Sequence, residues 1–169
     1  MKKYYIFLLA LLSIGLTGLN AQSNIEFEGT SNLILVAKKD ALKATGKLLT
    51  GETVRVGCSQ GECFLTIEYK DRTIKQVIGS EINLMSVYEY DFGADNDYEI
   101  VIIKRNKETT DLQIFLYSKG IIQELFKLDA GNNKTVLRKN YIEYNLPDGT
   151  DTVWNFYRGG FWQMTPFMK

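Results

Sequence analysis

The chain has 169 residues, of which 20 are basic, 20 are acidic and none is histidine. This balance leaves no basic excess, which argues against nucleic acid as a partner. The absence of histidine excludes catalytic pairs of serine or cysteine with histidine, and an apolar fraction of 45% indicates an ordered globular domain.

The first 21 residues have the composition of a secretory signal peptide. Lys2 and Lys3 form a basic start, Ile6–Leu16 is an apolar run, and Ala21 occupies the expected cleavage position. The apolar run is too short for a comfortable membrane span, and an uncleaved anchor is the alternative. We therefore predict an exported chain, periplasmic or secreted, whose residues 22–169 form a single domain without a membrane span.

Short runs of β-branched and aromatic residues, separated by turn residues, recur along the rest of the chain. This spacing predicts an all-β fold, either an antiparallel sandwich or a small barrel, with at most one or two short helices. A helix is expected within Asp40–Thr45, ended by Gly46, and a polar crossover is the alternative. The strands expected in the first half are Ile25–Glu28, Leu33–Ala37, Thr53–Gly57, Phe64–Tyr69 and Ile74–Ile78.

Cys58 and Cys63 are the only cysteines in the sequence. In an exported chain an even pair predicts a disulfide. The bond would close a short loop, for which the chain-entropy model gives ~2 kcal/mol, so we expect it to fasten a turn without holding the fold together. The spacing is not that of a thioredoxin-type motif, and a zinc site would need further cysteine or histidine ligands.

The centre of the chain predicts two strands joined by an acidic turn. Val87–Phe92 alternates apolar and polar residues, and Tyr98–Ile103 is rich in β-branched residues. The run Ile100–Ile103 indicates a strand that is buried on both faces. In the turn, Gly93 and Asn96 can adopt positive φ angles at little cost.

Four carboxylates, those of Asp91, Asp95, Asp97 and Glu99, crowd this turn. Their repulsion requires solvent or a hard cation with oxygen ligands, such as Ca²⁺. The segment Asp91-Phe-Gly-Ala-Asp-Asn-Asp-Tyr-Glu-Ile resembles the calcium loop of FG-GAP/VCBS-type repeats, with Asp91, Asp95 and Glu99 at its first, fifth and ninth positions. Gly93 departs from that pattern because a third-position ligand is expected there. The resemblance implies a weak Ca²⁺ site, and a solvated acidic turn is the alternative.

The strands expected in the second half are Leu112–Tyr117, Ile121–Leu128, Val136–Asn145, Val153–Tyr157 and Phe161–Met164. The C-terminal third is also rich in aromatic residues: Tyr141, Tyr144, Trp154, Phe156, Tyr157, Phe161, Trp162 and Phe167. Most of them are expected in the core, at alternate strand positions. Tyr157, Arg158 and Trp162 are the candidates for an exposed contact, because a neighbouring glycine pair leaves room around them.

The sequence contains no recognisable catalytic set. It has no glycine-rich phosphate loop, and the carboxylates that a glycosidase would need are neighbours on one turn. We therefore predict an exported, non-catalytic binding protein whose partner is a protein of the envelope or extracellular space, of inhibitor or immunity type. The alternative is a carbohydrate- or ligand-binding module that uses the C-terminal aromatic residues and a calcium-supported loop.

Overall fold

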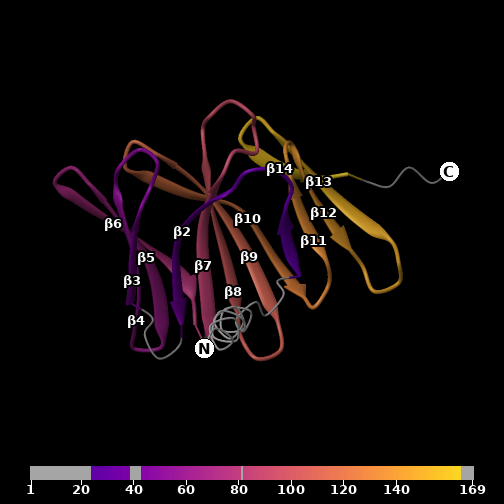
Figure 1. Ribbon diagram of the computed structural model, residues 1–169, viewed down its shortest axis with the longest axis horizontal. Helices are drawn as coiled ribbons and strands as arrows, with labels where there is room; N and C mark the ends of the chain where they lie inside the picture. The colour runs from indigo at the N-terminus through magenta and orange to yellow at the C-terminus, as the bar shows by residue number, and fades with distance from the viewer. Residues whose placement is uncertain (1–23, 39–42, 81, 165–169) are drawn as a thin grey trace, which may run out of the picture.

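The computed structural model describes residues 24–38, 43–80 and 82–164. This part of the chain is built from strands arranged in three sheets, and the middle sheet lies between the other two (Figure 1). The all-β class and the sandwich alternative are confirmed, because the sheets pack face to face and none closes into a barrel. The predicted signal peptide and Phe167 lie outside the described residues.

Each sheet contains four strands that follow one another in the chain, and each of these strands is antiparallel to the next. The N-terminal sheet has the order β3 (Lys43–Lys47), β4 (Thr53–Ser59), β5 (Glu62–Tyr69) and β6 (Arg72–Gly79). The middle sheet has the order β10 (Ile121–Gly131), β9 (Thr110–Ser118), β8 (Glu99–Arg105), β7 (Leu84–Tyr90) and β2 (Asn32–Lys38). The C-terminal sheet has the order β1 (Ile25–Phe27), β11 (Thr135–Arg138), β12 (Tyr141–Asn145), β13 (Asp151–Tyr157) and β14 (Gly160–Gln163).

One pairing departs from the antiparallel prediction. Strand β1 runs parallel to β11 at the edge of the C-terminal sheet, with Ile25 opposite Thr135. The two strands lie far apart in the sequence, so no hairpin turn imposes opposite directions on them.

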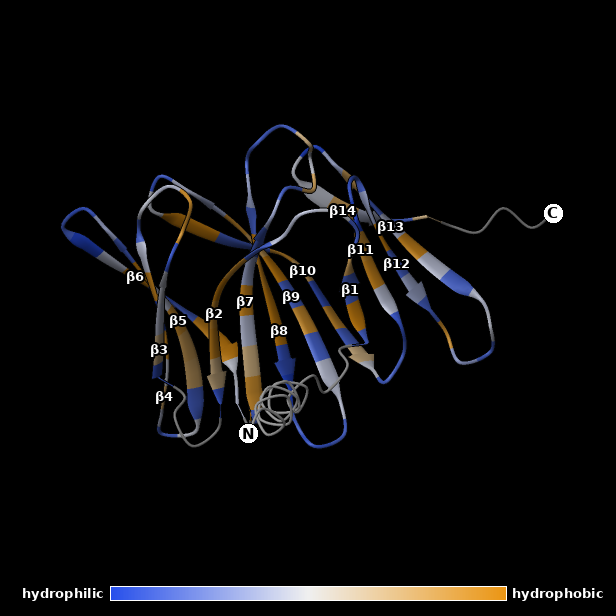
Figure 2. Ribbon diagram, viewed as in Figure 1, coloured by the Kyte–Doolittle hydropathy of each residue, from blue (hydrophilic) through white to orange (hydrophobic). Residues whose placement is uncertain are grey.

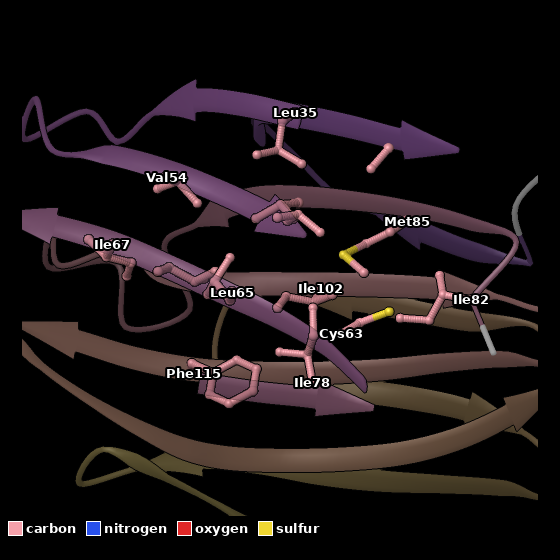
Figure 3. Packing of buried hydrophobic residues seen from close by; sticks show 14 of the residues in the cluster. Leu35, Val54, Cys63, Leu65, Ile67, Ile78, Ile82, Met85, Ile102 and Phe115 are labelled. Carbon is pink, nitrogen blue, oxygen red and sulfur yellow. The ribbon is translucent and has the colours of Figure 1, made fainter. Parts of the chain in front are cut away.

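The middle sheet is buried on both faces, as the sequence of β8 predicts. Ile100 and Ile102 pack in a cluster against the N-terminal sheet, together with Leu65 and Phe115 (Figure 3). Val101 and its neighbour Ile103 pack in a second cluster against the C-terminal sheet. Hydrophobic segments accordingly stand out on the strands of the middle sheet, such as β7 and β8, whereas most turns are hydrophilic (Figure 2).

The second cluster is mainly aromatic. The ring of Phe92, which is fully buried, has its centroid 4.7 Å from that of Tyr90, 5.0 Å from that of Phe161 and 5.9 Å from that of Phe156. Trp154 also packs against this cluster, so the predicted core position of the C-terminal aromatic residues is confirmed for these side chains.

The predicted helix within Asp40–Thr45 is wrong in its described part, because Lys43–Lys47 forms β3. Gly46 is a site of close approach and not a helix stop. A Cβ atom at this position would lie 2.3 Å from the backbone oxygen of Ile34, so only glycine lets β3 pass so close to β2. Tertiary packing therefore overrides the local helical signals. Residues 40–42 lie outside the described residues.

The single strand predicted for Val136–Asn145 is also wrong, because a tight turn at Lys139 and Asn140 divides it into β11 and β12. Asn140 has a φ angle of 70°, a conformation that asparagine tolerates better than most residues. Its backbone N–H donates to the carbonyl of Phe92, and its carbonyl accepts from Phe156, so the turn is held on both sides.

The predicted disulfide between Cys58 and Cys63 is present. The two residues face each other across the β4–β5 hairpin. The bond indicates an oxidising setting outside the cytoplasm. Among the described residues, no helix is long and apolar enough to cross a membrane.

We expect the Cys58→Ala, Cys63→Ala double variant to fold, with a loss of ~2 kcal/mol in free energy of unfolding. Alanine is chosen because Cys63 is buried in the core, where a serine hydroxyl would add a separate cost. Urea unfolding of both proteins measures the difference. Failure of the double variant to fold would show that the hairpin depends on this bond.

Candidate functional site

The acidic loop between β7 and β8 projects at the top of the view in Figure 1. Most of its hydrogen bonds join residues within the loop. The carboxylate of Asp91 accepts from the backbone N–H of Asp95 at 3.2 Å and from that of Asn96 at 3.3 Å. The carboxylate of Asp95 accepts from the backbone N–H of Asp97 at 3.0 Å. Two of the predicted calcium ligands therefore stabilise the turn directly.

Positive φ angles occur in this loop at Ala94 and Asn96. Asn96 therefore uses the conformation that the sequence allows, and Gly93 does not. The glycine serves another purpose, because a Cβ atom at position 93 would lie 2.9 Å from a carboxylate oxygen of Asp95. The folded-over carboxylate of Asp95 takes the space that a third-position ligand would need.

Glu99 differs from the other three carboxylates because it is buried. It is 3% exposed, and its carboxylate accepts a hydrogen bond from the backbone N–H of Phe92 at 3.2 Å. Burial raises the pKa of Glu99 to about 7, the Phe92 hydrogen bond opposes this, and the charges of Asp95 and Asp91 add to the rise. Within the described ranges, no three or more acidic, cysteine or histidine side chains form a group placed to hold a metal ion.

Calcium binding at Asp91, Asp95, Asp97 and Glu99 stays a prediction from the sequence. We expect affinity no better than ~10⁻⁴–10⁻³ M, because Gly93 lacks the third-position carboxylate and Ca²⁺ affinity follows ligand charge. When the Ca²⁺ concentration is ten times the dissociation constant, binding adds ~1.4 kcal/mol to the free energy of unfolding, which raises the melting temperature by a few degrees. The Asp95→Asn variant should lose most of that rise. Identical melting of the wild type in Ca²⁺ and in EDTA would leave the loop as a solvated turn.

Tyr157, Arg158 and Trp162 form an exposed group at the end of the β13–β14 hairpin, which we name the hairpin surface. The side chains of Tyr157 and Trp162 are 60% and 65% exposed. The guanidinium of Arg158 lies 5.1 Å from the centroid of the Tyr157 ring, and the indole N–H of Trp162 donates to the carbonyl of Tyr157 at 3.2 Å. The structure therefore places the three residues together and at the surface, as predicted.

The hairpin surface continues across the outer face of the C-terminal sheet. Trp162 is opposite Asn155, Asn155 is opposite Tyr141, and Tyr141 is opposite Arg138. These four residues form a row across four strands, on the face that points away from the core. Arg138 forms ion pairs with Glu28 and Glu143.

A cleft of about 510 Å³, which the sequence does not predict, lies beside the acidic loop. We name it the turn cleft, because turns and strand ends of the N-terminal and middle sheets form its walls. Its lining combines apolar, aromatic and polar residues: Leu48, Leu49, Thr50, Glu52, Tyr69, Glu89, Asn96, Asp97, Tyr98, Ile100, Leu116, Tyr117, Ser118 and Lys119.

Two contacts between sheets hold the walls of the turn cleft in place. The buried carboxylate of Glu89 accepts from the backbone N–H of Leu49 at 3.0 Å and from the side-chain amide of Asn32 at 2.8 Å. Gly120, in the β9–β10 turn, has φ +81°, and a Cβ atom there would lie 2.8 Å from the ring of Tyr69. These packed contacts between the two sheets therefore fix the shape of the cleft.

Tyr117 places a buried hydroxyl in the cleft lining. This hydroxyl has no hydrogen-bond partner of ordinary geometry among the described residues. Burial raises the pKa of Tyr117, and the nearby charge of Glu52 raises it further. The phenol therefore remains neutral at physiological pH, with the Glu52 carboxylate close to its hydroxyl.

Comparison with protein-family models, curated proteins and solved structures gives no match to this chain. The function therefore has to be argued from the geometry of the hairpin surface and the turn cleft.

Proposed function

We propose that the chain is an exported, non-catalytic binding protein, periplasmic or secreted, that binds a protein partner through the hairpin surface. The observation that carries this proposal is the exposure of Tyr157 and Trp162 beside Arg158 on one hairpin. The disulfide supports export, because such bonds persist in oxidising compartments.

Tryptophan, tyrosine and arginine are the residues that most often dominate the binding energy of protein interfaces. Here all three lie together, and the bond from the Trp162 indole to the Tyr157 carbonyl limits the freedom of the larger ring. A pre-oriented ring loses less conformational entropy when it binds. The group therefore suits the centre of an interface, surrounded by the polar residues of the outer sheet face.

The test is capture from envelope extract by the immobilised chain, followed by identification of the captured protein and calorimetry with the purified partner. Each of the Tyr157→Ala and Trp162→Ala variants should weaken binding by about 1–2 kcal/mol or more, or roughly tenfold. Intact-mass measurement of the exported chain checks that it begins at Gln22. If the partner is an enzyme or toxin, loss of its activity in the complex supports the inhibitor or immunity role.

Val77 provides a matched control, because it is also exposed (48%) but lies on β6 of the opposite outer sheet. The Val77→Ala variant should bind the partner as the wild type does. Equal capture by the wild type and by the Tyr157→Ala, Trp162→Ala double variant would contradict the proposal.

A second candidate is carbohydrate binding, which the row across the C-terminal sheet favours. Trp162 and Tyr141 lie two strands apart on one face, about 10 Å at the usual strand spacing, with Asn155 between them. Two rings so spaced can each stack on a sugar of one chain. A glycan array that binds the wild type but not the Trp162→Ala variant would favour this candidate over a protein partner.

A further inference from the structure

The turn cleft has the charge and shape of a small-ligand site that is separate from the hairpin surface. Its volume of about 510 Å³ lies within the usual range of ligand pockets. Three carboxylates, those of Glu52, Glu89 and Asp97, contribute to its lining, against the one amine of Lys119. The cleft therefore carries an excess of negative charge.

Among the described residues, no ion pair neutralises this negative charge. Across the described part of the chain, none of the ion pairs includes Glu52, Glu89 or Asp97. Glu89 is satisfied by two neutral donors, and Glu52 accepts from the hydroxyl of Thr50. Neutral donors leave the formal charge in place, so the cleft favours a positively charged occupant.

Aromatic rings complete the cleft. Tyr98 and Tyr117 contribute to its lining, and so does Tyr69, whose ring centroid lies 5.1 Å from the amine of Lys70. A cation over the face of such a ring is attracted by the ring electrons. The hydroxyl of Tyr117 lies in the same lining, close to the carboxylate of Glu52. Carboxylates and tyrosine rings are together groups that recognise an ammonium ion.

From this arrangement we infer that the turn cleft binds a small organic cation, an aliphatic amine whose ammonium group lies among Glu52, Asp97 and the tyrosine rings. The leucine side chains of the β3–β4 turn and of β9 provide apolar surface for its carbon chain. An anionic ligand would face uncompensated carboxylates, and a neutral sugar would leave their charge unpaired.

The test is isothermal titration calorimetry of the exported chain with spermidine at physiological ionic strength. We expect saturable binding that Glu52→Gln weakens about fivefold to tenfold, because it removes one carboxylate charge beside the cation. Tyr98→Leu should weaken binding about threefold, whereas Tyr98→Phe, which keeps the ring, should bind as the wild type does. Glu52 and Tyr98 are not in the core, so these variants are expected to fold.

The control is Glu62→Gln, which removes the same charge from an exposed position at the start of β5, outside the cleft lining. It should bind spermidine as the wild type does. Equal weakening by Glu62→Gln and Glu52→Gln would overturn the inference, because binding would then reflect overall charge. Absence of saturation with spermidine, or binding of maltose in its place, would overturn it too. The Trp162→Ala variant should retain spermidine binding, so failure of one proposal leaves the other standing.

Discussion

The Phe92→Ala variant is expected to lose about 3–5 kcal/mol of its free energy of unfolding. Phe92 is fully buried, and its ring joins Tyr90 of the middle sheet to Phe156 and Phe161 of the C-terminal sheet. Removal of the ring opens a cavity between two sheets that strand pairing does not connect. Domains of this size are typically stable by only about 5–15 kcal/mol, so the loss is large.

Urea unfolding with linear extrapolation measures this effect. Tyr157→Ala is the matched control, because it removes an aromatic ring that is 60% exposed and should change stability by no more than about 0.5 kcal/mol. A loss below about 1 kcal/mol in Phe92→Ala would contradict the described packing of the two sheets.

The Glu99→Gln variant is expected to be more stable than the wild type at pH 8 by about 2–3 kcal/mol. Because burial raises the pKa of Glu99 to about 7 from an ordinary value of 4.5, the folded state retains a proton that the unfolded state has already lost. The wild type therefore loses stability as the pH rises from 4.5 to 7, and the full cost of the buried charge is present above 7. Glutamine resembles the protonated side chain and avoids this cost.

Urea unfolding of both proteins in EDTA at several pH values between 4.5 and 8 checks this prediction. The advantage of Glu99→Gln should be near zero at the acidic limit and should grow with pH. Glu62→Gln controls for the loss of one negative charge. A constant difference across the range, or a lower stability of Glu99→Gln at pH 8, would show that Glu99 is not held in a raised-pKa state.

The sequence predicted the features that depend on local patterns. The hydrophobic run Ile100–Ile103 indicated a strand buried on both faces, and the single pair of cysteines in a chain expected to be exported indicated a disulfide that fastens a turn. Both are confirmed, because a continuous apolar run and two cysteines a few residues apart are local properties of the sequence. The exposure of Trp162 was also predicted from the glycine pair beside it.

The features that were missed depend on contacts between distant segments. Gly46 resembled a helix stop, but it is required because β3 passes close to Ile34, which no local pattern reveals. The turn cleft was missed because its walls come from segments of two sheets that meet only after folding. One signal was available: Glu89 places a carboxylate on the face of β7 that otherwise carries core residues such as Val87.

Site-specific photo-cross-linking tests the proposed binding role most directly. A photoreactive phenylalanine analogue replaces Trp162 in cells that export the chain, and a matched chain carries it at Val77 on the opposite outer sheet. The account predicts one discrete cross-linked protein adduct from position 162, found outside the cytoplasm, and none from position 77. No adduct from position 162, or the same adducts from both positions, would contradict a binding role for the hairpin surface.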